Sequence, residues 1–368
     1  MGNAIETAPP RSFDREGIFD RIGAFYDYRG VTPAAERYMV LDTGSYNTYA
    51  FRPKAGAIEW VVDRVGGGGW KSLLGAGALR AALTVPELLP ALPGIRSETL
   101  SVDAEDPFDV AVIGDRITLL GLEARRVCTI ATDDPEKLRR EIERRRRLPE
   151  SINTPAMLEY DLEYPYVVKR YLDGRELDDP VEEWKLLLDA LVQLTALYET
   201  DRHSVSTQDV LTGLETALSA AGQLDGLVRS GLELLGDLDL PPVLYRGPVH
   251  GDLHAGNLFV NDAVYVLDWE DVRTDYVIDD FFRPFVIHQY DAPVHRLFVQ
   301  MMAGRGTGGD IAADYAREVG PLAYGDSETY SGLPLFYLLS LLADGGDHGS
   351  LRPPCREILS GVLSLYDG

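Results

Sequence analysis

One stretch of the chain carries side chains that could position and neutralise a phosphate group. Residues 250–257 read His-Gly-Asp-Leu-His-Ala-Gly-Asn, and residues 267–270 read Leu-Asp-Trp-Glu at the end of a short apolar run. Asp252 could orient a hydroxyl group and accept its proton. The amide oxygen of Asn257 and the carboxylate of Asp268 are hard oxygen ligands, which Mg²⁺ prefers. Because phosphoryl transfer requires mainly positioning and charge neutralisation, this spacing predicts a phosphoryl-transfer centre.

The stretch 250–270 resembles the catalytic segment of aminoglycoside phosphotransferases, choline kinases and related small-molecule kinases. Those enzymes read His-Gly-Asp-Leu-His-x-Gly-Asn, followed by an apolar strand that ends in Asp-Trp-Glu. The resemblance implies that Asp252 is the catalytic base and that Asn257 and Asp268 hold Mg²⁺ beside ATP. The structural alternative is a polar hairpin that carries carboxylates by chance, but a full match at the right spacing is specific.

The same resemblance extends to three further residues in and near the loop. His250 matches the family's loop-bracing histidine, and Asp280, twelve residues after Asp268, matches a later aspartate that braces the catalytic loop. His254 also matches the motif, but the resemblance assigns it no definite role. We therefore expect His250 and Asp280 to be structural residues of the site.

The elements that must position this centre follow from the pattern of apolar residues. Three short strands with tight turns, one helix and two further strands indicate a small antiparallel sheet. The helix is expected to begin at the acidic residues and proline of 133–136 and to end near Arg147. The strands are expected at residues 109–113, 116–120, 125–130, 156–163 and 166–171.

The second half of the chain has a mainly helical pattern after residue 178, with residues 249–268 as the exception. This order of elements predicts an α+β fold. The resemblance implies a bilobal protein-kinase-like fold, with a small antiparallel N-lobe and a larger helical C-lobe. The expected divisions are an N-terminal extension at residues 1–105, an N-lobe at 106–172 and a C-lobe at 173–368.

The nucleotide contacts are expected on the sheet and its helix. The family pairs a lysine on the third strand with a glutamate on the following helix. Glu141 fits the role of this glutamate because it lies on the inward face of the helix. The alternative is that Glu141 is a solvated charge on the helix surface. Thr129 occupies the lysine position, so Lys169 is the expected nucleotide contact. Tyr171 is also an expected contact, because it lies on a strand that resembles the one whose backbone meets adenine. The alternative is that this strand is an ordinary edge strand. Other basic residues could replace the lysine, although arginine differs in reach: Lys54, Arg125 and Arg126.

A second segment, residues 42–49, also resembles the Gly-x-Ser-Asn-x-x-Tyr strand and loop of this family. It lies far before Asp252 in the sequence, which favours residues 108–171 as the compact sheet lobe and leaves 42–49 as a plain hairpin. Helical patterns are also expected before residue 30, at 57–65 and at 73–92. The first 105 residues could cap the sheet lobe, supply the missing phosphate contact or form a dimer contact.

The composition excludes several classes of partner. The chain has 35 basic residues, only five of them lysine, against 59 acidic residues, so its formal net charge is −24. Such a surface repels nucleic acid and anionic lipid. It suits a halophilic protein, with an ordinary acidic cytoplasmic protein as the alternative. Cys128 and Cys355 show no metal-ligand spacing, and no secretory signal or membrane-spanning run is visible, so we expect a cytoplasmic location.

Two functions fit these features. The first is a kinase that uses ATP and Mg²⁺ to phosphorylate a hydroxyl group of a small molecule. The second is a pseudokinase-like nucleotide-binding or regulatory protein, because the lysine and a glycine-rich loop are missing. The intact Asp252, Asn257 and Asp268 favour the first, and the pattern of Gly251 and His254 makes a protein kinase a distant alternative. The acceptor (an aminoglycoside, choline, a sugar, a nucleoside or a lipid-linked glycan precursor) and the oligomeric state stay open.

Overall fold

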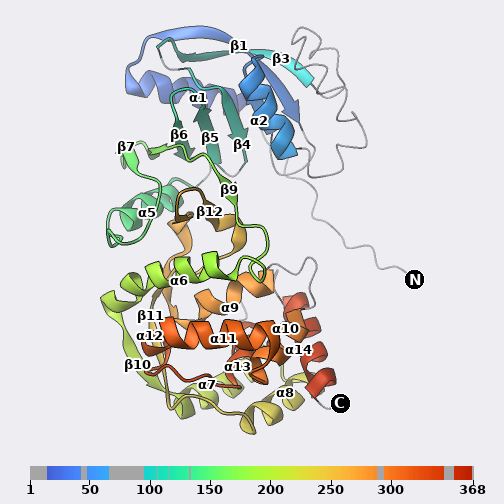
Figure 1. Cartoon of the computed structure of the whole chain (residues 1–368). Helices are drawn as coiled ribbons and strands as arrows, with labels where there is room; N and C mark the ends of the chain where they lie inside the picture. Colours follow the sequence, from blue (N-terminus) through green and yellow to red (C-terminus); the bar gives the residue numbers. More distant parts are fainter. Residues whose placement is uncertain are drawn as a thin grey trace, which may run out of the picture. The chain divides into compact units, whose positions relative to one another are not determined.

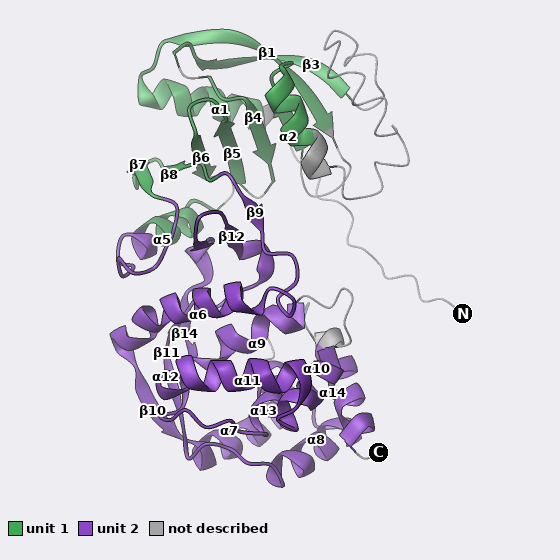
Figure 2. Ribbon diagram, in the orientation of Figure 1, with its two compact units in different colours: residues 1–142, 156–172 green, residues 143–155, 173–368 purple. Residues whose placement is uncertain are grey.

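The structure is a computed structural model of the 368-residue chain. It divides into two compact units (Figure 2). Unit 1 comprises residues 1–142 and 156–172, and unit 2 comprises residues 143–155 and 173–368. The residues that the structure describes are 15–42, 48–65, 95–105, 107–114, 116–131, 134–287, 294–343 and 352–366.

Unit 1 is built around an eight-stranded sheet with the order β3-β1-β2-β4-β5-β6-β8-β7 (Figure 1). Every neighbouring pair of strands is antiparallel. The strands are β1 Pro33–Asp42, β2 Thr48–Phe51, β3 Ile95–Asp103, β4 Val110–Ile113, β5 Arg116–Gly121, β6 Arg126–Ala131, β7 Met157–Asp161 and β8 Tyr166–Arg170. The helices that accompany them are α1 Arg15–Arg29, α2 Ala55–Val65 and α5 Pro135–Arg145, whose last residues belong to unit 2.

Alternation along β1 buries side chains on both faces of this sheet. Tyr38 belongs to an apolar cluster with Phe25 of α1, whereas the next residue, Met39, belongs to a cluster with Ile58 of α2. Successive side chains of a strand point to opposite faces, so α1 and α2 cover opposite faces of the sheet.

The chain before residue 105 contributes strands to this sheet. Val40 of β1 pairs with Ala50 of β2, and Tyr49 of β2 pairs with Val112 of β4. The expectation that residues 42–49 lie too far along the chain to share a compact sheet is therefore wrong, because strands pair by backbone geometry and not by sequence distance. Residues 43–47 and the helix expected at 73–92 lie outside the described residues.

The five strands expected between residues 109 and 171 are confirmed as β4 to β8, and the helix among them is confirmed as α5. The helix begins after Asp134, whose Oδ1 accepts a hydrogen bond from the N–H of Lys137 at 3.1 Å. Leu138 and Ile142 of α5 pack with Val167 of β8. This contact places α5 on the sheet face to which Val167 points.

Unit 2 is mainly helical and contains two three-stranded sheets, with the orders β10-β11-β14 and β13-β12-β9. Its strands are β9 Arg175–Glu176, β10 His203–Ser206, β11 Val243–Val249, β12 Leu258–Val260, β13 Val264–Val266 and β14 Arg273–Tyr276. The α+β fold class is confirmed. The helices are α6 Trp184–Tyr198, α7 Thr207–Ala220, α8 Gly226–Gly236, α9 Ile278–Ile287, α10 Val294–Met302, α11 Gly306–Glu318, α12 Gly320–Ala323, α13 Leu333–Ala343 and α14 Arg352–Tyr366.

The prediction of a mainly helical chain after residue 178, with residues 249–268 as the exception, missed three strands of unit 2. β10, β14 and most of β11 lie outside that exception. These strands are short, and the β10-β11-β14 sheet joins segments that are distant in sequence. Local residue patterns seldom mark such strands, because strand propensity depends strongly on the neighbouring strands and on burial.

The helix predicted from Trp184 to Tyr198 is confirmed as α6, and its apolar residues Leu187, Leu191 and Leu194 are buried in the core of unit 2. Among the described residues, no helix combines the length and the apolar character that crossing a membrane requires.

Candidate active site

The motif loop, residues 250–257, is held by one buried carboxylate. Asp280 of α9 accepts hydrogen bonds from the main-chain N–H groups of His250 at 2.8 Å and Gly251 at 3.1 Å. The hydroxyl group of Tyr198 on α6 donates to the same carboxylate at 3.1 Å. Hydrogen bonds among buried groups are strong and rigid, so they fix the start of the motif loop to α6 and α9.

His250 connects the motif loop to the chain before Asp268. Its Nε2 lies 2.7 Å from the carbonyl oxygen of Leu267, and its Nδ1 lies 3.4 Å from the N–H nitrogen of Asp252. Burial lowers the pKa of the fully buried His250 below its ordinary value. A neutral ring that donates from Nε2 and accepts at Nδ1 satisfies both contacts. The ring also packs against Trp269, with 4.9 Å between centroids.

Gly251 occupies a position that only glycine fits. Its φ of +83° lies in the left-handed region, and a Cβ here would lie 2.3 Å from the carbonyl oxygen of Asp271. The guanidinium of Arg273 on β14 donates to the carbonyl group of Gly251. The backbone directly before Asp252 is therefore closely packed and fixed.

Asp252 and Asn257 are in contact within the motif loop. Nδ2 of Asn257 donates to the main-chain carbonyl of Asp252 at 2.9 Å and lies 3.5 Å from its Oδ2. A short 3-10 turn at Ala255–Asn257 brings the two together, and Nδ1 of His254 caps this turn by accepting from the N–H of Gly256 at 3.1 Å. Because the amide nitrogen of Asn257 faces Asp252, its amide oxygen faces the opposite way, where a metal ion could bind.

Asp268 follows the β12-β13 hairpin, which returns the chain to the motif loop. Leu258 pairs with Val266 in this hairpin, and the N–H of Leu267 donates to the carbonyl of Asn257 at 2.8 Å. Asp268 itself has a φ of +55°, a left-handed conformation that aspartate tolerates better than most residues. Unusual backbone conformations of this kind concentrate at functional sites.

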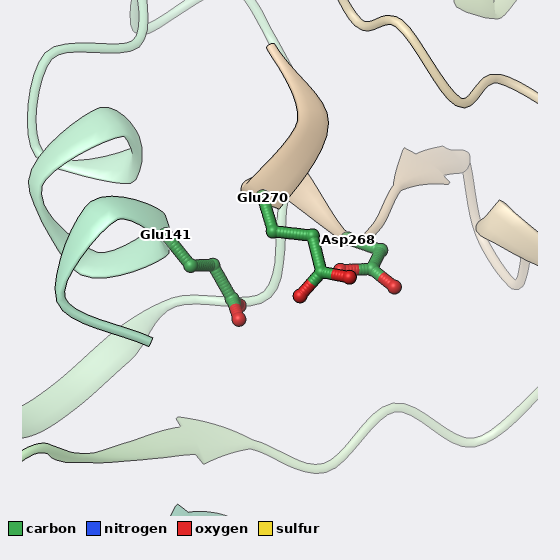
Figure 3. A group of neighbouring side chains, drawn as sticks. All are labelled: Glu141, Asp268 and Glu270. Carbon is green, nitrogen blue, oxygen red and sulfur yellow. The ribbon is translucent and has the colours of Figure 1, made fainter. Parts of the chain in front are cut away.

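Glu270 is an acidic residue to which the sequence analysis assigned no role. A carboxylate oxygen of Glu270 lies within 4.8 Å of one of Asp268 (Figure 3). These carboxylates and the amide oxygen of Asn257 are all hard donors, which suit Mg²⁺ better than a soft metal. The Asp-Trp-Glu motif at residues 268–270 was the sequence signal that could have identified Glu270 as a site residue. Figure 3 also labels Glu141, which belongs to unit 1.

Two basic side chains approach the carboxylate of Asp252. Nε and Nη2 of Arg283 on α9 lie 3.4 Å and 3.3 Å from its Oδ1, and Nε2 of His254 lies 3.6 Å from its Oδ2. Burial lowers the pKa of His254, although the charge of Asp252 opposes this shift. Arg283 was not predicted as a site residue, because it lies 31 residues after Asp252 in a segment read only as helix.

In unit 1, Glu141 is buried on α5 with 1% of its surface exposed, which excludes the alternative of a solvated helix charge. It accepts hydrogen bonds from Nζ of Lys169 at 3.0 Å and from Nη1 of Arg116 at 2.9 Å. Lys169 lies on β8 and Arg116 on β5, the two neighbours of β6, and both point to the same sheet face as Thr129. Arg116 was not predicted as a partner of Glu141, because no local pattern marks the strand arrangement that brings it there.

The other basic residues considered for the lysine role have different surroundings. Nζ of Lys54 forms an ion pair with the buried carboxylate of Asp109 at 2.5 Å. Arg126 begins β6 on the sheet face opposite Thr129, and Arg125 lies in the turn before it with a φ of +53°. Lys169 is therefore the lysine that accompanies Glu141.

Tyr171 directly follows β8. Its main-chain N–H donates to the carbonyl of Arg125 at 2.8 Å, so this donor is already used within unit 1. Its ring is partly buried against an apolar cluster that includes Leu120. A nucleotide contact of Tyr171 would therefore use its ring or its carbonyl group.

Comparisons with solved structures show weak likeness to several phosphotransferases. An ADP-bound aminoglycoside phosphotransferase, APH(2'')-Ib, is 14% identical, with 69% of this chain and 92% of that chain covered at a TM-score of 0.37. A macrolide 2'-phosphotransferase from Brachybacterium faecium is 15% identical, with 66% of this chain and 88% of that chain covered at a TM-score of 0.42. A choline kinase from Streptococcus pneumoniae is 14% identical, with 68% of this chain and 90% of that chain covered at a TM-score of 0.36. These TM-scores are too low to carry an argument.

The family is established by sequence. A comparison with curated proteins finds no match. Residues 112–316, more than half of the chain, match the phosphotransferase enzyme family APH. The matched region contains the motif loop, Asp268, Glu141 and Lys169. The chain therefore belongs to the phosphotransferase enzyme family, as the resemblance of residues 250–270 predicted.

Proposed function

We propose that this enzyme transfers the γ-phosphoryl group of ATP to a hydroxyl group of a small molecule, with Asp252 as the catalytic base. The observation that supports this proposal is the contact between Asp252 and Asn257 in a loop that Asp280 holds by two hydrogen bonds. A carboxylate and an amide oxygen are thereby kept at a constant separation, which is what phosphoryl transfer requires of a protein.

Asn257 and Asp268 would hold Mg²⁺, with the carboxylate of Glu270 beside Asp268. When bound, Mg²⁺ supplies charge neutralisation for the triphosphate. The left-handed backbone of Asp268 and the hydrogen bond between Leu267 and Asn257 keep these ligands close to the end of the motif loop. Hence the chain itself sets the spacing of the oxygen donors.

The carboxylate of Asp252 would orient the acceptor hydroxyl and take its proton. As the acceptor oxygen forms a bond to the γ-phosphorus, the bond from this phosphorus to the departing ADP oxygen breaks. The products are a phosphate ester, ADP and one proton, which Asp252 later releases to water. Asp252 is suited to this exchange because its side chain is 33% exposed, whereas the groups that support it are buried.

The nucleotide contacts are proposed for unit 1. Glu141 would hold the ammonium group of Lys169 so that it can bind phosphate oxygens of ATP, and the ring or carbonyl group of Tyr171 would meet the adenine. Lys169 keeps 17% of its side chain exposed, so a phosphate group could still reach it. This arrangement would compensate for Thr129 at the usual lysine position.

The test is an acceptor screen with labelled ATP and Mg²⁺ in molar KCl, covering aminoglycosides, macrolides, choline, amino sugars, other sugars and nucleosides. With the acceptor found, Asp252→Ala should lower transfer about 10²- to 10⁴-fold while MgADP affinity changes little. The matched control is Asp262→Ala, an exposed acid at the tip of the β12-β13 hairpin. Tight MgADP binding without transfer to any acceptor would favour the pseudokinase-like alternative, and full transfer by Asp252→Ala would remove the case for the base.

A further inference from the structure

We propose that Arg283 is a positioning residue that holds the Asp252 carboxylate in its reactive orientation, an inference that rests on the function proposed for Asp252. Nη2 and Nε of Arg283 lie 3.3 Å and 3.4 Å from Oδ1 of Asp252. The arginine side chain is 6% exposed, whereas that of Asp252 is 33% exposed. Arg283 therefore approaches Asp252 from the protein side and leaves the solvent side to an acceptor.

Arg283 divides the two oxygens of Asp252 between different tasks. The guanidinium contacts Oδ1, whereas the contacts of Oδ2 among the described residues are slightly longer, 3.5 Å to Nδ2 of Asn257 and 3.6 Å to Nε2 of His254. Oδ2 is thus the oxygen that an acceptor hydroxyl can approach. A carboxylate without Arg283 could rotate about its side-chain bonds and lose this division of roles.

The same helix turn fixes the backbone and the side chain of this part of the loop. Asp280 of α9 holds the N–H groups of His250 and Gly251, and Arg283, three residues later, holds the side chain of Asp252. Residues three apart on a helix lie on the same face, so one rigid surface sets both contacts. Misplacing a reacting group by about 1 Å can cost on the order of 100-fold in rate.

The surroundings of Arg283 speak against a purely stabilising role. Its Nη1 is buried without a hydrogen-bond partner among the described residues, and its ion pair with Asp279 is long, at 3.9 Å. A buried donor that makes no hydrogen bond destabilises the fold, and a buried ion pair is often no more stabilising than apolar packing. The contact with Asp252 gives this buried charge a role that its pairing with Asp279 does not supply.

The experiment compares Arg283→Met and Arg283→Lys with wild type, using the acceptor found in the screen. Arg283→Met should lower kcat about 100-fold with acceptor KM and MgADP affinity within about threefold, because binding surfaces stay intact. Arg283→Lys, which keeps the charge and one contact, should recover part of this loss. Arg356→Met is the matched control, since Arg356 pairs with Asp225 away from the motif loop and should leave kcat unchanged.

Two additions keep the outcome decisive. If Arg283→Met unfolds, the double variant Arg283→Met/Asp279→Asn, which also neutralises the buried acid that Arg283 shares with Arg273, should show the same loss of kcat. A crystal structure of the folded variant needs no turnover, and should show the Asp252 carboxylate rotated with the backbone of 250–257 unchanged. Unchanged kcat, or an Asp252 carboxylate that stays in place, would overturn the proposal. A wild-type enzyme without any transfer would instead count against the function proposed for Asp252.

Discussion

The ammonium group of Lys169 lies 3.0 Å from the carboxylate of Glu141, and the two residues come from β8 and α5. The strand between, β6, carries Thr129 at the position where this enzyme family is expected to have the lysine. Because β6 and β8 are neighbours and both side chains point to the same sheet face, a lysine on β8 can reach the same glutamate. The lysine–glutamate pair is therefore present, but its lysine lies on β8 and not on β6.

Lys169→Met should weaken MgADP binding about 10- to 100-fold, because hydrogen bonds to charged groups contribute roughly 1.5–3 kcal/mol each. Isothermal titration calorimetry with MgADP measures the change. The control is Lys185→Met, since the Lys185 side chain is 74% exposed and pairs with Asp314 in unit 2. Equal affinities for the two variants would refute a nucleotide contact by Lys169.

Asp268→Asn should weaken the Mg²⁺-dependent part of ADP binding by at least about tenfold, because it removes a charged oxygen ligand. Affinity measured without divalent cations should stay nearly the same. Asp271→Asn, an exposed acid three residues later, should leave both affinities as in wild type. If the Mg²⁺-dependent part of ADP binding in Asp268→Asn equals that of wild type, Asp268 is not a metal ligand.

Gly251→Ala should lower the free energy of unfolding by about 3 kcal/mol or more. Its φ of +83° strains any side chain, and the added Cβ would also collide with the carbonyl of Asp271. Gly222→Ala separates these two effects, because Gly222 has a φ of +65° but no atom within 4 Å of an added Cβ. That variant should lose only about 1 kcal/mol in urea unfolding. Equal losses would mean that the close approach to Asp271 contributes nothing.

Acidification should destabilise the protein through His250. Burial holds the folded-state pKa of His250 below the value of about 6.5 expected in the unfolded chain. Between these two values the unfolded state binds a proton that the folded state does not, so the free energy of unfolding rises with pH and falls on acidification. In urea unfolding, the free energy of unfolding should fall less between pH 7 and lower pH for His250→Asn than for wild type. The variant His203→Asn, at an exposed position, should behave like wild type. If the free energy of unfolding of His250→Asn falls on acidification as much as that of wild type, His250 is not the cause of the acid destabilisation.

High salt should stabilise the fold. A net charge of −24 repels itself, and the screening length falls from about 10 Å at 0.1 M to about 3 Å at 1 M salt. The midpoint of thermal unfolding should therefore rise with KCl concentration, and sucrose, which does not screen charge, should not reproduce the whole increase. A midpoint that stays constant or falls in molar KCl would argue against adaptation to salt.

The sequence by itself determined the chemistry-bearing loop and its local geometry. The resemblance of residues 250–270 implied an apolar strand directly before Asp268, and β13 occupies that place. These features depend on turns and strands within about twenty residues, where residue types dictate the backbone. The same holds for α5 and for the strands from β4 to β8, whose apolar patterns are local.

Only the tertiary structure decided which distant side chains meet these residues. Arg116 and Lys169 reach Glu141 because β5 and β8 flank β6, and Arg283 reaches Asp252 because α9 packs beside the motif loop. The β1-β2 hairpin was expected from its local pattern, but its pairing with β4 in the sheet of unit 1 was not. Such contacts depend on strand order and helix packing, which many distant residues set together, so no short pattern could have revealed them.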